Sequence, residues 1–216
     1  MSRTGAVLRE RLQRAGVALL PDAAHRLERY LDLLLEANRE VNLVSRREAT
    51  REVLLERHVL DALEALPFLP SPTGRKTRFL DVGSGGGFPA VPLLLARPDL
   101  EGWLVESVGK KARFLERVTT DLGLTARVLN ARFPDPALKL MRNAGLCDLL
   151  TSRAVAEAGE IAKRARPALA PGAVALLWTT EPLVGGLKDA LPGARVTFRR
   201  SPVAETRGIA RVERFT

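Results

Sequence analysis

Apolar residues in the first third of the chain recur at intervals of three or four, which is typical of amphipathic helices. The pattern predicts three helices, at residues 7–15, 21–40 and 47–66. The stretch Pro67–Gly74, with the sequence Pro-Phe-Leu-Pro-Ser-Pro-Thr-Gly, breaks helices and is the expected linker. We therefore expect a helical segment at residues 1–70 that packs on a second domain at residues 75–216.

After the linker, short apolar runs alternate with helical patterns. The expected strands are residues 78–82, 103–106, 126–130, 148–152, 174–178, 195–200 and 209–215. The expected helices are residues 89–97, 110–122, 137–144, 157–168 and 183–190. Strands that alternate with helices form right-handed βαβ units, so the pattern predicts an α/β fold with a mainly parallel sheet of seven strands. No helix separates the last two strands, which indicates an antiparallel hairpin at one edge.

The composition narrows the class of protein. The longest apolar stretches, Leu31–Leu35 and Val91–Ala96, are far shorter than the ~20 residues that span a bilayer. The chain starts without the apolar core of a secretion signal, and its single cysteine, Cys147, provides neither an internal disulfide nor a cysteine metal site. We expect a cytoplasmic protein of one main domain, without metal or membrane contact.

The charge balance is basic. There are 34 Lys and Arg residues against 25 Asp and Glu, a formal charge of +9, and 28 of the cations are Arg. Arg binds phosphate and stacks on bases, which suits RNA, although a biased genome composition also enriches Arg. Cations gather at both ends of the chain, in residues 1–14 and 195–216. This distribution favours a polyanionic partner.

A glycine-rich turn follows the first expected strand. The sequence Phe79-Leu-Asp-Val-Gly-Ser-Gly-Gly-Gly-Phe-Pro89 places a G-x-G-x-G run between that strand and a helix. In open α/β sheets ligands bind at the carboxyl ends of the strands, and glycine lets backbone approach a ligand closely. Dinucleotide folds prefer G-x-G-x-x-G, and the third glycine of that pattern is replaced here by Phe88.

An acidic residue ends the second expected strand. Glu106 comes 21 residues after Gly85, the offset at which a carboxylate binds ribose hydroxyls in nucleoside-binding α/β folds. Both nicotinamide dinucleotides and S-adenosylmethionine carry such a ribose. The turn and Glu106 together therefore predict a nucleoside site without naming the nucleoside.

Three blocks of this domain carry a family resemblance: residues 81–92, residues 105–115 and Asp148-Leu-Leu-Thr-Ser-Arg-Ala-Val155. With Asn38, Asn42-Leu43 and Arg57-His-Val-Leu-Asp61 upstream, they resemble the RsmG family (glucose-inhibited division protein B). That family consists of small-subunit ribosomal RNA guanine-N7 methyltransferases. The resemblance implies a Rossmann-like class I fold that uses S-adenosylmethionine, with 16S rRNA or the small ribosomal subunit as partner.

The resemblance also implies site residues. It assigns Gly83, Ser84, Gly85 and Phe88 to the cofactor site, Glu106 to the ribose, and Arg132, Phe133 and Pro134 to the adenine. Arg153 is implied to face the methionine end of the cofactor or the target base, and it is the expected catalytic residue. The family usually has Arg-Ala-Glu or Arg-Val-Glu where this chain has Arg132-Phe133-Pro134.

The chemistry of guanine N7 fits the set of motifs that the sequence has and lacks. N7 carries a lone pair and no proton, so methylation needs proximity and orientation rather than a general base. The chain has neither the Asn/Asp-Pro-Pro-Tyr/Phe tetrapeptide of amine methyltransferases nor a Pro-Cys nucleophile. Because N7 is buried in the major groove of duplex RNA, the target base must be splayed from a loop or reached before assembly.

We expect the protein to be a monomer.

Two other functions stay open at this point. A nicotinamide-dependent oxidoreductase would share the glycine turn, although the G-x-G-x-G spacing and the lack of a Tyr-x-x-x-Lys pair count against it. A catalytically silent RNA-binding relative would fit the altered segment at residues 132–134. His58 is expected to pack the helical segment on the sheet rather than to bind RNA phosphate. For the cations Lys110, Lys111, Arg113 and Arg117, RNA phosphate and plain solvent are equally good expectations.

Overall fold

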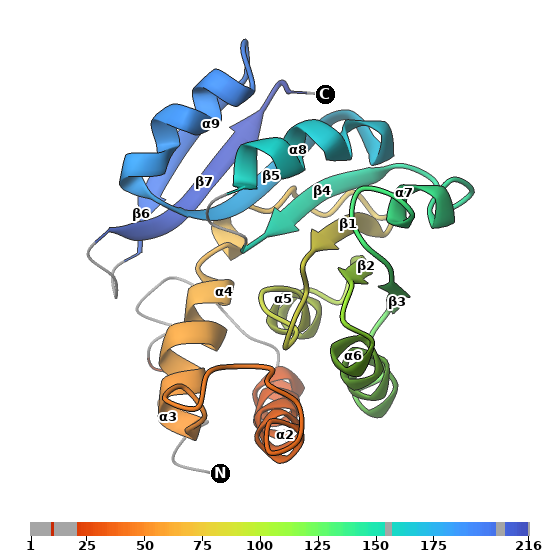
Figure 1. The fold of residues 1–216 in the computed structure, drawn as a ribbon, viewed down its shortest axis with the longest axis vertical. Coiled ribbons are helices and arrows are strands. Elements are labelled where there is room, and N and C mark those ends of the chain that lie inside the picture. The colour runs from red at the N-terminus through yellow and green to blue at the C-terminus, as the bar shows by residue number, and fades with distance from the viewer. Residues whose placement is uncertain (1–9, 11–20, 154–156, 202–205, 216) are drawn as a thin grey trace.

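The computed structural model describes residues 10, 21–153, 157–201 and 206–215. The expected helix at 7–15 and the expected cationic N-terminus fall almost entirely outside these residues. The described part forms one seven-stranded sheet in the order β3-β2-β1-β4-β5-β7-β6 (Figure 1). Its strands are β1 (Thr77–Val82), β2 (Leu100–Glu106), β3 (Ala126–Asn130), β4 (Cys147–Ser152), β5 (Leu169–Thr180), β6 (Arg195–Arg200) and β7 (Arg207–Glu213).

The sheet is parallel except at one edge. Pairs β1–β2, β1–β4, β2–β3 and β4–β5 are parallel, whereas β7 is antiparallel to both β5 and β6. The mainly parallel sheet and the antiparallel edge hairpin predicted from the sequence are thus confirmed. The neighbours β1 and β4 are not consecutive in the chain, so the chain changes direction across the sheet there, and the loops beside this switch point are where ligands bind in such folds.

Helices cover both faces of the sheet (Figure 1). In chain order after β1 they are α5 (Ala90–Ala96), α6 (Gly109–Asp121), α7 (Ala137–Leu140), α8 (Ala158–Ala165) and α9 (Val184–Ala190). The last two pack on each other and on β4, β5 and β6, whereas α5 and α6 pack on β2 and β3 at the other face. The expected helix at 137–144 ends four residues early, because residues 141–146 turn toward β4 with Gly145 at φ +79°.

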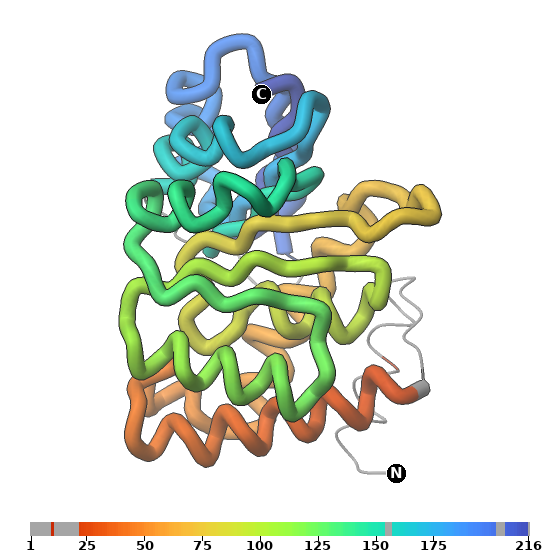
Figure 2. Tube along the Cα trace, turned by 90° about the vertical axis from the view of Figure 1, so that its right-hand side faces the viewer, coloured from red at the N-terminus to blue at the C-terminus, as the bar shows by residue number. Residues whose placement is uncertain are grey.

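The upstream segment adds a further layer on α5 and α6. Helix α2 (Pro21–Ala37) packs across both of them, and Figure 2 shows it running beneath the sheet toward the edge where the strands end. Its apolar residues share one core with those helices, including Tyr30, Leu34, Val91 and Leu115. The segment therefore contributes to the interior of the fold and does not hang from it.

The expected helix at 47–66 was wrong in its start and its form. The Thr50 hydroxyl accepts a hydrogen bond from the Val53 N–H and caps α3 (Arg51–Leu54), so the helix starts four residues late. Residues Leu55–Leu60 form a π-helical turn, which continues into α4 (Asp61–Leu63) and the 3₁₀ turn Leu66–Phe68. The wider π turn sets His58 and Asp61 on the side that faces the sheet, where both are buried.

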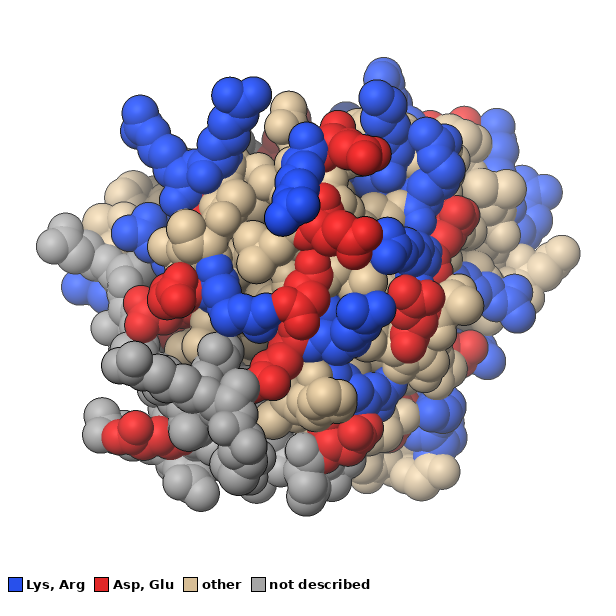
Figure 3. All heavy atoms as spheres, turned by 90° about the horizontal axis from the view of Figure 1, so that it is seen from below, with Lys and Arg blue, Asp and Glu red and all other residues tan. Residues whose placement is uncertain are grey.

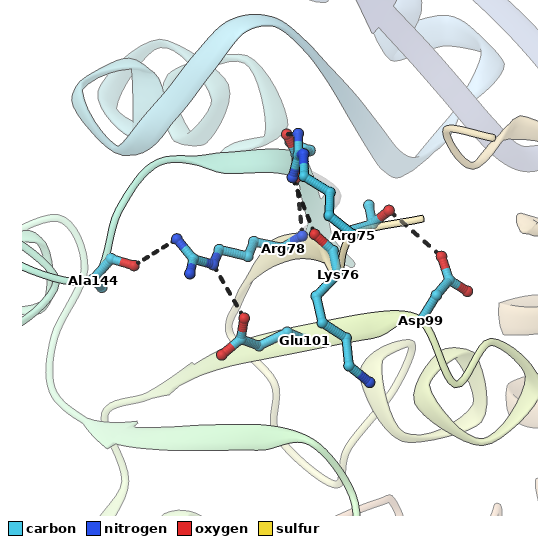
Figure 4. Close-up of polar contacts among 8 residues, drawn as sticks. Arg75, Lys76, Arg78, Asp99, Glu101 and Ala144 are labelled. Carbon is cyan, nitrogen blue, oxygen red and sulfur yellow. Dashed lines mark hydrogen bonds and ion pairs between the residues drawn. The ribbon is translucent and has the colours of Figure 1, made fainter. Parts of the chain in front are cut away.

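Polar contacts fasten the amino ends of the strands (Figure 4). Arg75, two residues before β1, donates two hydrogen bonds to Asp148 of β4, at 2.8 and 2.7 Å. The Arg78 guanidinium donates to Glu101 on β2 and to the Ala144 carbonyl, both at 3.1 Å. This cluster lies at the amino ends of the strands, whereas the glycine turn lies at their carboxyl ends.

Candidate nucleoside and methyl-transfer site

The glycine turn is held against the neighbouring strand. The N–H groups of Gly83 and Ser84 donate to the Val105 carbonyl on β2, at 3.0 and 3.1 Å. Gly83, Gly85 and Gly87 have φ values of +77°, +55° and +100°, which residues with a Cβ rarely adopt. A Cβ built on Gly83 would meet nothing within 4 Å, so this stretch of backbone borders open space.

Glu106 organises the end of β2. One of its carboxylate oxygens accepts the Gly85 N–H at 2.9 Å, and the other accepts the Val108 N–H at 2.8 Å. Each oxygen keeps a second lone pair, so the carboxylate can still accept hydrogen bonds from a ligand. The sequence offset of 21 residues thus corresponds to a direct contact between the acid and the turn.

The segment after β3 joins the same edge of the sheet. The Glu106 carbonyl accepts hydrogen bonds from the Asn130 side chain at 3.0 Å and from the Ala131 N–H at 3.1 Å. The next residues start at this point: Arg132 is exposed, and Phe133 and Pro134 are half-buried. The structure therefore brings this segment next to Glu106.

Phe88 lies at the centre of an aromatic and cationic cluster. Its buried ring packs against Tyr30, with the ring centroids 5.4 Å apart, and against His58 at 4.9 Å. The Arg153 guanidinium carbon lies 5.9 Å from the centroid of the same ring. Side chains from α2, the π turn, the glycine turn and the end of β4 meet here.

Arg153 is held by the upstream helices. Its Nη2 lies 3.0 Å from a carboxylate oxygen of Asp61, and its Nη1 lies 3.4 Å from His58 Nδ1. Figure 1 shows the end of β4 beside α4, which carries Asp61. Sequence reasoning assigned Arg153 to the site but gave no such role to Tyr30 or Asp61, and it expected His58 only to pack. The signal for the last two was present, because the Arg57-His-Val-Leu-Asp61 block places them one helical turn apart.

Burial dominates the protonation of this cluster. Burial raises the pKa of Asp81 from its ordinary value of 3.8 to about 6, although the hydroxyl of Thr151, 2.6 Å away, and the charge of Arg153 act in the opposite direction. Burial and the positive charge of Arg153 lower the pKa of His58 to about 4. At neutral pH His58 is therefore an uncharged ring.

The residues predicted from the sequence differ in whether they border the open cradle or point into the interior. Gly83, Gly85 and Glu106 form one continuous cradle with the backbone at 132–134 nearby. Ser84 turns its side chain inward, where its hydroxyl donates to the Asp81 carbonyl at 3.3 Å and is buried. Cys147 lies in the core, where burial raises the pKa of its thiol to about 12, as expected for an inert cysteine.

Two basic side chains, those of Arg46 and Lys111, line an open groove beside the turn. The loop Asn42–Arg46 and Lys111 of α6 line an open groove of about 620 Å³. Among the described residues, no carboxylate pairs with Arg46, Lys110, Lys111 or Arg113, whereas Arg117 pairs with Glu36 and Asp121. Figure 3 shows this underside of the molecule, over α2, α3 and α6. Its upper rim, the side on which the strands end, is mostly basic.

The described part of the chain contains neither a candidate metal site nor a candidate membrane-spanning helix. No group of three or more His, Cys, Asp or Glu side chains is placed to hold a metal ion. None of the described helices has the length and apolar character needed to cross a membrane.

Solved structures resemble this fold at low identity. The fibrillarin/Nop5p complex matches with a TM-score of 0.60 and 18% identity, over 74% of this chain and 82% of that chain. A precorrin-6y C5,15-methyltransferase from Geobacter metallireducens GS-15 matches with a TM-score of 0.56 and 12% identity, over 71% of this chain and 88% of the other. These likenesses confirm the Rossmann-like methyltransferase fold.

Sequence comparisons identify the family. Proteins named ribosomal RNA small subunit methyltransferase G are similar over most of the chain. The one from Acidiphilium cryptum is 34% identical over 95% of this chain and 91% of its own length. The one from Halorhodospira halophila is 37% identical over 88% and 84%. The family model described as rRNA small subunit methyltransferase G (GidB) matches residues 23–181, and the chain therefore belongs to this family.

Proposed function

We propose that this protein transfers a methyl group from S-adenosylmethionine to N7 of a guanine in small-subunit (16S) ribosomal RNA. The observation that carries the proposal is the cradle of Gly83, Gly85 and Glu106, which lies beside the Phe88–Arg153 cluster in a chain of this family. The protein would act in the cytoplasm as a monomer, on the free RNA or on the assembled subunit.

The residues present fit the cofactor. The open side of Gly83 leaves room for a ligand against the backbone, and Glu106 retains lone pairs for the ribose hydroxyls. Arg132, Phe133 and Pro134 would border the adenine, and the Ser84 backbone would complete the turn. Phe88 presents an aromatic ring, which attracts a cation such as a sulfonium, and Arg153 would bind the carboxylate end or face the target base. When bound, the cofactor supplies an electrophilic methyl group.

The chain's own groups then need only to orient the acceptor. Guanine N7 has no proton to lose, so no residue has to act as a base. The neutral His58 and the buried Phe88 ring keep water away from this corner, and the Asp61–Arg153 ion pair fixes the guanidinium beside it. Catalysis on this view rests on position and on the charge of the surroundings.

Transfer of a tritiated methyl group to small-subunit rRNA, followed by mass mapping of the methylated base, tests the proposal. We expect label at one guanine and a 7-methylguanine signature. Folded protein that transfers no label above background would overturn the proposal in favour of a silent RNA-binding relative. Titration with S-adenosylhomocysteine and with NAD tests the oxidoreductase alternative, because only the former should bind.

A further inference from the structure

A small polar cavity adjoins the cluster around Arg153. It has a volume of about 60 Å³ and is lined by Asp61, Arg153, Trp178, Thr179, Arg207 and Gly208. Three elements of the sheet end or begin here, since β4 ends just before Arg153, β5 ends at Thr180 and β7 begins at Arg207. The cavity therefore lies at the carboxyl ends of the two strands beyond the switch point, and it shares Arg153 with the cluster around the Phe88 ring.

Two polar groups in this cavity lack a hydrogen-bond partner among the described residues. The Thr179 hydroxyl belongs to a residue that is 1% exposed, and it makes no hydrogen bond. One carboxylate oxygen of Asp61, which is 5% exposed, lies 3.0 Å from Arg153 Nη2 as an ion pair but makes no hydrogen bond of good geometry. Buried polar groups in native proteins are nearly always satisfied, so these two indicate that a polar ligand completes the site.

The walls of the cavity hold these groups in place. The Trp178 indole N–H donates to the Asp61 carbonyl at 3.3 Å, which anchors the backbone of α4 to β5. Strand pairing sets Thr179 opposite Gly208 and Thr180 opposite Arg207, so the side chains of Thr179 and Arg207 start from opposite faces of the sheet, and both residues line the cavity where these strands meet. The lining thus combines an acceptor, Asp61, with two residues that can donate, Thr179 and Arg207, and the charge of Arg207 acts on the Asp61 carboxylate.

This arrangement matches one edge of one base. The Watson–Crick edge of guanine presents the O6 acceptor beside two donors, N1–H and the 2-amino group. Adenine and cytosine present a ring nitrogen that is an acceptor and would face the carboxylate unfavourably, and uracil has only one N–H on this edge. Enzymes that act on a splayed base commonly recognise it by hydrogen bonds to this edge.

We propose that this cavity recognises the Watson–Crick edge of the target guanine, with the Asp61 carboxylate accepting N1–H and the 2-amino group. The Thr179 hydroxyl and the Arg207 guanidinium donate to O6. A volume of about 60 Å³ admits the edge of a base and not a whole nucleoside. N7 lies on the adjoining Hoogsteen edge and takes no part in these contacts, so it stays free to react. The inference rests on the proposed function, since it specifies the base that the methyl group reaches.

Inosine provides the test, because it lacks only the 2-amino group of guanosine. Methyl transfer is measured on RNA that carries either guanosine or inosine at the modified position, and kcat/KM is compared. We expect the native enzyme to prefer guanosine by roughly 10- to 100-fold, the loss expected when a hydrogen bond to a charged group is removed. Equal kcat/KM on the two RNAs would overturn the inference and leave a cavity filled by water alone.

The Asp61→Ala variant separates base recognition from support of Arg153. If Asp61 only positions Arg153, activity on both RNAs falls by the same factor and the preference persists. If Asp61 binds the base, the guanosine preference falls to about threefold or less, whatever the absolute rate. Comparing this preference between the variant and the native enzyme also cancels the intrinsic difference in N7 reactivity between the two bases.

Two further variants keep the test decisive. Thr179→Val keeps nearly the same shape, and we expect about a tenfold lower kcat/KM on guanosine RNA with unchanged affinity for S-adenosylhomocysteine. Asp99→Ala removes another carboxylate paired with an arginine, Arg97, at the amino ends of the strands, and it should keep the full preference. A native enzyme that methylates no guanosine RNA would instead refute the proposed function itself.

Discussion

At the scale of single residues, the glycines of the turn have different duties. Gly83 faces open space, whereas a Cβ on Gly87 would lie 2.8 Å from Val91 Cγ2 and 2.9 Å from the Tyr30 hydroxyl. Gly87 is thus required for packing, and Gly83 is available to a ligand. The sequence shows the same letter at both positions, and only the fold distinguishes them.

The Gly83→Asp substitution tests this distinction. Its side chain and negative charge would enter the space assigned to the cofactor, so we expect binding of S-adenosylhomocysteine to be abolished in isothermal titration. Gly123→Asp is the matched control, since Gly123 also has a positive φ and an open Cβ position but lies between α6 and β3. Unchanged affinity of the Gly83 variant would remove this residue from the site.

Asp81 predicts a particular dependence of stability on pH. Its pKa is raised by burial from 3.8 to about 6, so the folded state holds the proton more tightly than the unfolded chain. Its contribution to stability is therefore full below about pH 4, is lost as the pH rises to about 6, and stays constant above. In urea unfolding, the stability of Asp81→Asn relative to the native protein should rise by about 2 kcal/mol across this window. A difference that does not change with pH would contradict the assignment.

Much of the candidate cradle was predictable at this scale, whereas the cluster around Phe88 and Arg153 was not. The glycine turn and Glu106 lie at the ends of two consecutive strands, so their spacing predicts that they share one site, although their direct hydrogen bond appears only in the structure. Tyr30, His58 and Asp61 come from helices tens of residues upstream, and their meeting with Phe88 and Arg153 depends on how those helices pack. Periodicity marks such residues as buried without indicating what they face.

At the scale of elements, α2 supports the glycine turn directly. The Tyr30 hydroxyl donates to the Gly86 carbonyl at 2.6 Å, across 56 residues of sequence. Burial raises the pKa of this phenol well above its ordinary value, so it stays a donor at any physiological pH. This single bond connects the upstream segment to the backbone that would hold the cofactor.

We expect Tyr30→Phe to lower both stability and cofactor affinity. Leaving the buried Gly86 carbonyl without a partner costs about 1–2 kcal/mol of unfolding free energy, and the loosened turn should bind S-adenosylhomocysteine several-fold more weakly. Denaturant unfolding and calorimetric titration measure the two effects. Leu27→Val, in the same helix, should cost about 1 kcal/mol without changing affinity. Equal affinities for Tyr30→Phe and the native protein would show that the bond is structural only.

The elements that sequence patterns misjudged are those shaped by their neighbours. Strand β5 spans Leu169–Thr180 rather than the expected 174–178, because it pairs with β4 at one end and with β7 at the other. Strand β7 starts two residues before expectation for the same reason. The π turn at Leu55–Leu60 is likewise absent from any periodic pattern of apolar residues.

At the scale of the whole molecule, the amino and carboxyl ends of the parallel strands carry different kinds of contact. The amino ends of the strands carry the contacts of Arg75 and Arg78 (Figure 4), and their carboxyl ends carry the candidate site. We expect Arg78→Ala to lower the unfolding free energy by about 1 kcal/mol and to leave S-adenosylhomocysteine affinity unchanged. Thermal unfolding and titration of the same samples check this. A parallel loss of affinity would show that the two ends are coupled.

The charge of the molecule suggests where RNA approaches. Arg46 and Lys111 border the groove beside the glycine turn and have no carboxylate partner among the described residues. We expect the double variant Arg46→Glu and Lys111→Glu to weaken rRNA binding at least tenfold at low salt, with a smaller effect at high salt. Reversing Arg117, which already pairs with Glu36, is the control and should have little effect. Equal binding by the two variants would place the RNA elsewhere.

The position of Phe88 has a consequence for how such a protein can be divided. Its ring belongs to the catalytic fold, yet its neighbours Tyr30 and His58 come from the preceding helices. A fragment that begins after the linker would expose that ring to solvent at the mouth of the site, together with the apolar sides of α5 and α6. The upstream helices therefore cannot simply be exchanged for others, because replacing them would require a redesign of the hydrophobic core that they share with α5 and α6.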